Sequence, residues 1–289
     1  MFDALITAQT LQAGLATGEY LIFDVRHDLK NHLAGRRAYE QGHIPGAHYL
    51  DHENQLSAPK TGRNGRHPLP ALADFSALMR EQGLTPASKV VVYDADIGMF
   101  AAHLWWMLRW LGHEQVAVLD GGWQAWLASG AATQTEADPL CAGAGQVLQT
   151  TVTQAAAAMP TVDADAVLAN LREPVFTLID ARAGNRYAGE VEPMDPVAGH
   201  IPGALNRPNS LNLQANGHFK TPAQLRTEFN ALLAGRSPAQ IVHQCGSGIT
   251  ACHNLFAMDL AGLEGSALYP GSWSEWCSDT TRPVARGTD

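Results

Sequence analysis

The sequence predicts an α/β protein built from two tandem domains of one fold, each a parallel sheet flanked by helices on both faces. Four landmarks occur twice in the same order, between 150 (269 − 119) and 157 (199 − 42) residues apart, which indicates an internal repeat. Short β-rich runs also alternate with longer helical patterns, as in parallel sheets. A length of 289 residues is itself long for a single core. The landmarks are LIFDVR (21–26) and TLIDAR (177–182), GHIPGA (42–47 and 199–204), VVVYD (90–94) and IVHQC (241–245), and LDGGW (119–123) and YPGSW (269–273).

The elements of the first copy follow from its hydrophobic periodicity. Residues 21–25, 89–94 and 115–119 are apolar and β-branched, so they are predicted strands. Residues 68–83 and 98–112 have helical patterns, and the first of these begins with proline, which a first helical turn accepts. Because reactive sites of such sheets lie beyond the carboxyl ends of the strands, the residues that follow each strand are the candidates for function.

The boundary between the copies falls in a segment of small and polar residues, 131–146. We predict a first domain over 1–136, a linker over 137–146 and a second domain over 147–289.

Composition excludes several classes of function. The net charge is 19 − 28 = −9, which argues against nucleic acid or an anionic membrane as partner. Four cysteines are too few for a disulfide scaffold, and neither a secretory signal nor a membrane-length apolar run is visible. We expect a cytoplasmic protein without a metal or cofactor, whose substrate is a small molecule.

The stretch HQCGSGITAC (243–252) contains the strongest chemical signal. Cys245 ends a strand, and Gly246 and Gly248 allow the chain to curl before a helix that we expect to begin near Ile249. The N–H groups from Gly246 to Thr250, together with the helix dipole, would stabilise a thiolate or an anion carried on its sulfur. The alternative is a buried structural cysteine.

The first copy acts as an internal control. Its matching strand ends in Asp94, which cannot form a thiolate, so we expect the first domain to be catalytically inactive. Cys252 lies within the predicted helix and is interpreted as a core residue. With His253 it does not give the spacing of a zinc site.

The sequence around Cys245 argues against two common classes of cysteine enzyme. A cysteine phosphatase would need an arginine where this chain has Ala251, and papain-like acyl transfer would need partners far downstream of Cys245. A short cradle of N–H groups suits a smaller group, a single sulfur atom held as a persulfide.

These motifs resemble the tandem-domain rhodanese superfamily. CGSGITAC is similar to the CGSGVTAC loop of its 3-mercaptopyruvate sulfurtransferases, and the likeness covers almost the whole chain, including both GHIPGA segments. The resemblance implies a two-step reaction in which Cys245 takes sulfur from a small anionic donor and releases pyruvate, or sulfite when the donor is thiosulfate. Cyanide, a small thiol or thioredoxin would then accept the sulfur.

The resemblance also implies roles for other residues. Ser247 would form a relay with His67 and Asp51 of the first domain, or it only shapes the loop. Arg186 would bind the carboxylate of the donor because guanidinium presents a rigid fork, or it is a surface arginine. Thr250 either bonds the persulfide or caps the helix.

The donor preference is left open by one departure from the family pattern. Relatives often have a second arginine in a Glu-Pro-Arg stretch, where this chain has VEPMDP with Met194. The uncharged loop favours mercaptopyruvate, and Met194 speaks against it, so thiosulfate remains the alternative. A non-enzymatic sulfur-relay or binding module is the alternative of another class.

Overall fold

The computed structural model describes residues 2–135 and 157–288, which fall into two compact units. The first comprises the described residues of Met1–Ala58 and Pro70–Ala158, and the second comprises Pro59–Leu69 and the described residues of Met159–Asp289. The predicted linker at 137–146 and the first ten residues of the predicted second domain, 147–156, lie outside the described residues.

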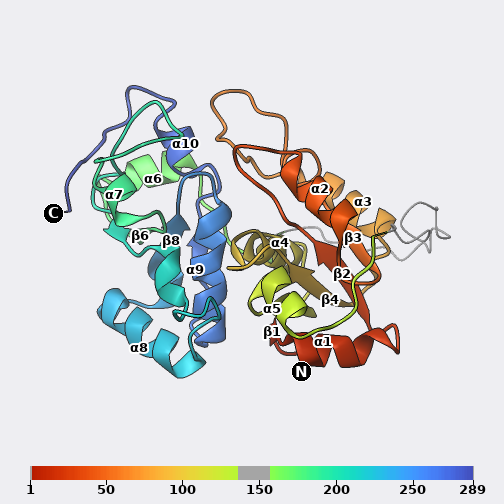
Figure 1. Ribbon diagram of the computed structural model, residues 1–289. Helices are drawn as coiled ribbons and strands as arrows, with labels where there is room; N and C mark the ends of the chain where they lie inside the picture. Colours follow the sequence, from red (N-terminus) through yellow and green to blue (C-terminus); the bar gives the residue numbers. More distant parts are fainter. Residues whose placement is uncertain (1, 136–156, 289) are drawn as a thin grey trace. The chain divides into compact units, whose positions relative to one another are not determined.

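The first unit has a five-stranded parallel sheet in the order β1-β5-β4-β2-β3, of which Figure 1 labels β1, β2, β3 and β4. The strands predicted near 21–25, 89–94 and 115–119 are confirmed as β2, β4 and β5. Its elements are β1 (Leu5–Ile6), α1 (Ala8–Leu15), β2 (Tyr20–Asp24), α2 (Ala34–Gln41), β3 (Ala47–Tyr49), α3 (Leu72–Glu81), β4 (Lys89–Tyr93), α4 (Met99–Trp110), β5 (Val116–Leu119) and α5 (Gly122–Ala128).

The second unit repeats this topology. Its named strands are ordered β7-β6-β8-β9, all parallel, and a parallel bridge between Thr161 and Leu268 supplies the equivalent of β1 beside β9. The predicted repeat is therefore confirmed. Its elements are α6 (Ala164–Asn170), β6 (Thr177–Asp180), α7 (Gly184–Tyr187), β7 (Leu205–Asn206), η2 (Asn209–Asn212), α8 (Pro222–Leu233), η3 (Pro238–Gln240), β8 (Ile241–Gln244), α9 (Ile249–Leu260), β9 (Ala267–Leu268) and α10 (Ser272–Trp276).

Alternate residues of the second sheet face opposite layers of helices, as the period of a strand requires. Leu178 and Val242 are buried in a cluster with residues of α6 and α10. Ile179 and Ile241 are buried in another cluster with residues of α8 and α9. Both faces of this parallel sheet are covered, in agreement with the predicted fold class.

An aspartate and an arginine form a buried ion pair at the end of the corresponding strand of each unit. The Nη2–Oδ2 distance is 2.6 Å for Arg26–Asp24 and 2.7 Å for Arg182–Asp180, and the two carboxylates are fully buried. Each guanidinium also donates to the carbonyl of the glycine that opens GHIPGA, at 2.7 Å from Arg26 to Gly42. The equivalent bond from Arg182 is 2.8 Å long. The pair therefore joins the strand end to the following turn.

The two GHIPGA histidines have the same structural role in each unit. His43 stacks on Tyr39, and its Nδ1 lies 2.8 Å from the carbonyl oxygen of that residue. His200 stacks on Tyr187 with the same 2.8 Å contact. Both rings are buried, so we interpret these histidines as structural residues that fix each GHIPGA turn against the preceding helix.

The segment Pro59–Leu69 has its contacts in the second unit, although the repeat places it in the first domain. Hydrogen bonds to residues of the second unit hold the segment there. The backbone N–H of Arg66 donates to Ser274 Oγ at 3.0 Å, and His67 Nδ1 lies 2.8 Å from Ser247 Oγ. One backbone N–H and one side chain of this loop thus contact residues close to Cys245 in sequence or space.

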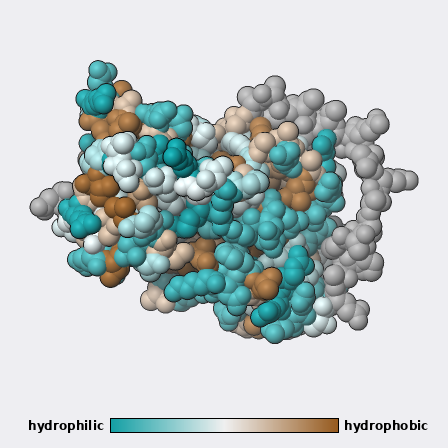
Figure 2. Space-filling view, turned by 90° about the horizontal axis from the view of Figure 1, so that it is seen from above, coloured by the Kyte–Doolittle hydropathy of each residue, from teal (hydrophilic) through white to brown (hydrophobic). Residues whose placement is uncertain are grey.

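The face shown in Figure 2 is largely hydrophilic, and its apolar residues form separate patches. Single exposed apolar side chains of this kind are usual on globular proteins. No helix in the described part of the chain is long and apolar enough to span a bilayer.

Candidate active site

Cys245 lies between a fully buried strand and a long helix. It follows β8 directly, is 1% exposed and forms no disulfide. The helix α9 begins at Ile249, where the sequence predicts its start. Gly248 precedes it with φ 88°, and a Cβ there would lie 2.7 Å from the carbonyl oxygen of Pro270. Only glycine fits this turn, from which α9 begins.

One sequence-based interpretation of this loop is wrong. The capping role considered for Thr250 does not exist, because Gly248 occupies the N-cap position and α9 has no side-chain cap. Thr250 is already the second residue of the helix and is partly buried. The other interpretation of Thr250 remains a prediction, namely that its hydroxyl contacts a group carried on the sulfur of Cys245.

The equivalent loop of the first unit shows what such a turn does with a negative group. The carboxylate of Asp94 is buried and accepts four backbone N–H groups at 2.8 to 3.4 Å. Burial raises the pKa of Asp94, and the N–H groups of Phe100, Gly98 and Ala101 oppose the rise by stabilising the charged form. The donors are Asp96, Gly98, Phe100 and Ala101.

The two loops correspond closely. Gly98, with φ 76°, precedes α4 as Gly248 precedes α9, and neither helix has a side-chain cap. Asp94 therefore occupies the place of Cys245, with its oxygens where the group on the sulfur would lie. The scaffold is one that holds an anion by backbone amides.

Ser272 is a positioning residue that the sequence-based reasoning missed. It has φ 54°, a strained value for any residue other than glycine, and its Oγ accepts the N–H of Cys245 at 3.1 Å. The same Oγ donates to the carbonyl of Tyr269 at 2.9 Å. In the first unit the corresponding residue is Gly122, with φ 54° and no side chain. A serine where the sibling domain has glycine was the available signal.

Replacing Ser272 by glycine should separate strain from function. Glycine relieves about 1 kcal/mol of backbone strain but removes the hydrogen bond to Cys245, itself worth about 1 kcal/mol. We expect kcat/KM for sulfur transfer to fall about fivefold, while the free energy of unfolding is unchanged or slightly higher. The Ser272→Ala variant keeps the strain and loses the bond, so it should lose both activity and stability. Full activity in both variants would show that the hydroxyl has no positioning role.

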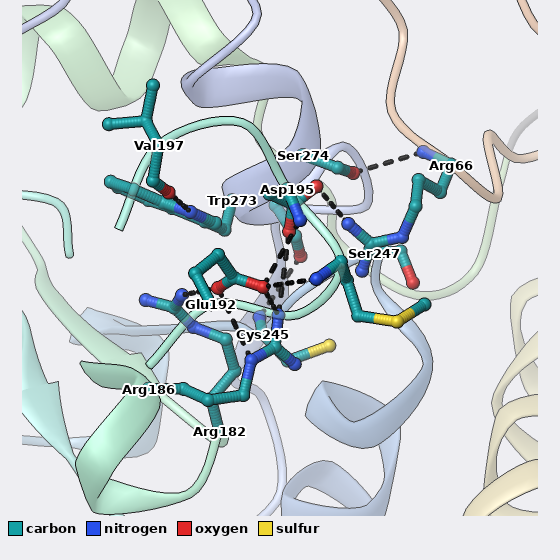
Figure 3. A network of polar contacts seen from close by, with 12 residues as sticks. Arg66, Arg182, Arg186, Glu192, Asp195, Val197, Cys245, Ser247, Trp273 and Ser274 are labelled. Carbon is teal, nitrogen blue, oxygen red and sulfur yellow. Dashed lines mark hydrogen bonds and ion pairs between the residues drawn. The ribbon is translucent and has the colours of Figure 1, made fainter. Parts of the chain in front are cut away.

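Two arginines lie on either side of Cys245 in Figure 3, and each is paired with a buried acid. Arg186 donates to Glu192 through Nη2 at 2.6 Å and Nε at 3.3 Å, a forked contact. Arg66 pairs through Nη1 with Asp195, which also lies 3.5 Å from Arg186 Nη2. Burial raises the pKa of Asp195, and the charge of Arg66 acts in the opposite direction. The two arginine side chains are about one-fifth exposed, whereas both acids are 3% exposed.

Both guanidinium groups converge on Gly246, the residue after the cysteine. A Cβ at this position would lie 2.8 Å from Arg66 Nη2 and 3.6 Å from Arg186 Nη1. The sequence pointed to Arg186 alone as the arginine for the donor carboxylate. Arg66 is brought to this place by the loop 59–69, which belongs to the second unit.

Met194 contributes no charge to this cluster. Its backbone N–H donates to Glu192 Oε1 at 3.0 Å, and the next N–H, of Asp195, donates to the same oxygen at 3.2 Å. The segment thus serves to fix the carboxylate that holds Arg186.

Ser247 and His67 are joined directly. Ser247 Oγ and His67 Nδ1 are 2.8 Å apart, and both residues are 5% exposed. Asp51, the third predicted member of the relay, belongs to the first unit, where its carboxylate accepts the N–H groups of Glu53 and Asn54 at 2.9 and 3.1 Å. The serine–histidine pair is thus present within one unit, and the role of Asp51 stays a prediction.

The second cysteine of the loop is unsuited to nucleophilic attack. Cys252 is fully buried in α9, and its Sγ donates to the carbonyl of Gly248 at 3.3 Å. Burial raises the pKa of the Cys252 thiol well above its usual value, so it stays protonated.

Comparison with known proteins agrees with the repeat. A family model described as Rhodanese-like domain matches twice, at residues 7–129 and 163–279. A probable 3-mercaptopyruvate sulfurtransferase of Pseudomonas aeruginosa is 47% identical over 285 residues, 98% of each chain. A putative thiosulfate sulfurtransferase, SseB of Mycobacterium tuberculosis, is 38% identical over 99% of this chain and 98% of its own. The solved structure of 3-mercaptopyruvate sulfurtransferase from Leishmania major superposes with a TM-score of 0.80 at 28% identity, covering 98% of this chain and 76% of that one.

Proposed function

This chain belongs to the rhodanese-like domain family, and on that premise we propose that it is a sulfurtransferase that moves a sulfur atom from 3-mercaptopyruvate to a thiophilic acceptor through a persulfide on Cys245. The main support for this proposal is the surroundings of Cys245. Cys245 is a free cysteine that directly follows β8 and precedes the glycine turn before α9, and two arginines converge on the adjacent residue, Gly246. This arrangement supports an anion site at the sulfur and a carboxylate site beside it.

The first step is written from this geometry. The thiolate of Cys245 attacks the sulfur of the donor, an S–S bond forms, and the C–S bond breaks with its electron pair moving into the enolate of pyruvate. The methylene carbon then takes up one proton, which balances the proton that the donor thiol loses. The pair Ser247–His67 is the proposed route for that proton and a hydrogen-bond partner for the enolate oxygen.

The persulfide would then occupy the cradle of N–H groups. The support is Asp94, whose carboxylate fills the corresponding turn of the first unit with four N–H donors. A terminal persulfide sulfur is an anion at about the same distance from the backbone as the carboxylate oxygens of Asp94. The equivalent N–H groups of the second unit would therefore bind it until an acceptor arrives. Covalent storage divides one difficult transfer into two easier steps.

The donor carboxylate would exchange with the acids that now hold the arginines. Glu192 and Asp195 keep Arg186 and Arg66 in place in the absence of a donor, and a planar carboxylate can accept the same forked contacts. Arg66 then supplies the second guanidinium that the segment around Met194 lacks.

The contribution of Arg66 is testable by its effect on KM. We expect Arg66→Gln to raise KM for 3-mercaptopyruvate about tenfold with little change in kcat, because the contact binds donor and transition state alike. Arg63→Gln is the matched control, since Arg63 is an exposed arginine of the same loop. An unchanged KM in Arg66→Gln would remove Arg66 from the donor site.

Thiosulfate is the second candidate donor, and the two arginines are the observation that favours it, because they also suit a dianion. The two reactions differ in their demand for protons. Sulfite leaves thiosulfate with its electron pair and needs no proton on carbon, whereas pyruvate does. The serine–histidine pair should therefore matter for one donor only.

The decisive experiment compares both donors in the wild type and in Ser247→Ala, with cyanide as acceptor and thiocyanate as the measured product. We expect a higher kcat/KM for 3-mercaptopyruvate in the wild type. In Ser247→Ala that value should fall about 100-fold, the usual range for lost acid–base assistance, with thiosulfate turnover nearly unaffected. A wild-type preference for thiosulfate, or an equal loss with both donors, would contradict the proposed donor.

The remaining assignments extend the same proposal. We propose residues 1–136 as an inactive domain with Asp94 at the cysteine position, 137–146 as linker and 147–289 as the catalytic domain. A cytoplasmic location and a thiol acceptor, including thioredoxin, fit the reduced Cys245. A non-enzymatic sulfur-relay module would instead show a reactive Cys245 without turnover of any small donor.

A further inference from the structure

Three metal-ligating side chains lie together in the first unit, outside the site described above. His27, His32 and Glu53 each offer one ligand atom, and these atoms all lie within 4.8 Å of one another. His32 Nδ1 is 3.7 Å from Glu53 Oε2. Two ligands on one tetrahedral zinc ion, at about 2.0–2.2 Å from it, are separated by roughly 3.3–3.6 Å, so this pair is already close to the required spacing.

The fold brings these residues together at one edge of the sheet. β2 and β3 are adjacent and parallel, with Asp24 beside Tyr49, so the segments that leave their carboxyl ends begin side by side. His27 follows β2 by three residues, and Glu53 follows β3 by four.

Both segments are held in shape by neighbouring aspartates. The carboxylate of Asp28 accepts the N–H groups of Lys30 and Asn31 at 2.7 and 2.9 Å, which fixes the turn between the two histidines. That of Asp51 accepts the N–H of Glu53 at 2.9 Å. The ligand-bearing turns are therefore ordered before any ion arrives, which lowers the entropic cost of binding one.

A layer of aromatic rings supports His27 from below. Its ring centroid lies 5.4 Å from that of His52 and 5.2 Å from that of Phe100. His52 Nε2 is in turn 3.1 Å from His103 Nδ1, and both of these rings are buried. Supporting contacts of this kind fix the orientation of a ligating ring.

The electrostatics of the cluster suit a cation. Burial lowers the pKa of His103 to about 4, so this buried ring adds no positive charge at neutral pH. The carboxylates of Glu53, Asp51 and Asp28 all act on His27 and give the cluster a negative potential.

We propose that His27, His32 and Glu53 bind one divalent first-row transition cation, most simply zinc. The ion would cross-link the segments that follow β2 and β3. Two imidazoles and a carboxylate are a known zinc ligand set, with water in the remaining position. This inference revises the expectation of no metal, which considered cysteine-containing spacings only. His27 and His32 are close in sequence, whereas Glu53 follows the next strand and joins them only through the topology of the sheet.

The test uses the untagged full chain carrying Cys245→Ser, so that the thiolate cannot act as a ligand. Titration with Co²⁺ reports four-coordinate binding by visible absorption, and Zn²⁺ affinity is measured by competition with a chromophoric chelator. We expect one ion per chain and a rise in the melting temperature with Zn²⁺. His32→Ala and Glu53→Gln should each weaken Zn²⁺ binding by at least about tenfold.

The controls make each outcome informative. His32 is about half exposed and Glu53→Gln preserves shape, so we expect neither change to disturb the fold, and circular dichroism of each variant checks this. His218→Gln alters a histidine of the second unit and should bind as before. Absence of binding, equal affinity in all variants, or binding seen only when Cys245 is present would each overturn the proposal. None of these outcomes depends on the donor or the sulfur-transfer activity.

Discussion

Replacement of Cys245 by serine should abolish sulfur transfer. A serine hydroxyl in the same turn can accept the same N–H groups, but it cannot form a persulfide. We expect kcat/KM with either donor to fall by more than about 10⁴-fold, as for loss of other enzymatic nucleophiles. The measurement is thiocyanate formation, accompanied by mass spectrometry of the protein after incubation with donor alone. The wild type should gain the mass of one sulfur atom, and the variant should gain none.

Cys252→Ala is the matched control for this prediction. Cys252 lies one helical turn into α9 with a thiol that burial keeps protonated, so it cannot replace Cys245 as the attacking group. Removing it deletes one buried sulfur and should leave the persulfide mass shift intact. Sulfur transfer that survives in Cys245→Ser, or a mass shift that disappears only in Cys252→Ala, would refute the assignment of the nucleophile.

The fold was predictable from sequence because its determinants are local and occur twice. The DVR and DAR strand ends and the two GHIPGA segments place equivalent hydrogen bonds at equivalent strand ends, as in the contacts of His43 and His200 with the preceding helices. The start of α9 was predictable for the same reason, since a glycine at 248 defines the turn. Periodicity and turn chemistry act over a few residues, and a single sequence records them directly.

The polar partners of the site were less predictable because they depend on long-range contacts. Arg66 reaches the cysteine loop only because the segment 59–69 packs with the second unit, an exchange that the linear repeat does not reveal. Glu192 and Asp195 are ordinary surface residues by sequence, yet both are nearly fully buried against arginines. Ser272 had a local signal, its difference from Gly122, but its strained φ is visible only in three dimensions.

Disruption of the buried ion pair beside the site should have the largest effect on stability. Arg182 and Asp180 are 1% and 0% exposed, and Arg182 also bonds the carbonyl of Gly199 and lies 3.4 Å from Glu192. Arg182→Met removes the cation and leaves a carboxylate buried without compensation, which costs about 3–5 kcal/mol in the free energy of unfolding. We expect urea unfolding of the second unit to shift accordingly and its melting temperature to fall by roughly 10–20 °C.

A double-mutant cycle separates the worth of the pair from the penalty of an orphaned charge. In Asp180→Asn with Arg182→Met the buried charge is gone, so the double variant should be more stable than Arg182→Met alone, because the cost arises from the unpaired carboxylate. Lys89→Met is the surface comparison, since Lys89 and Glu19 form an exposed pair whose loss should barely move the melting temperature. Two outcomes would contradict a stabilising role of the buried pair between the strand end and the GHIPGA turn. Arg182→Met could be as stable as the wild type, or the double variant could be less stable than Arg182→Met.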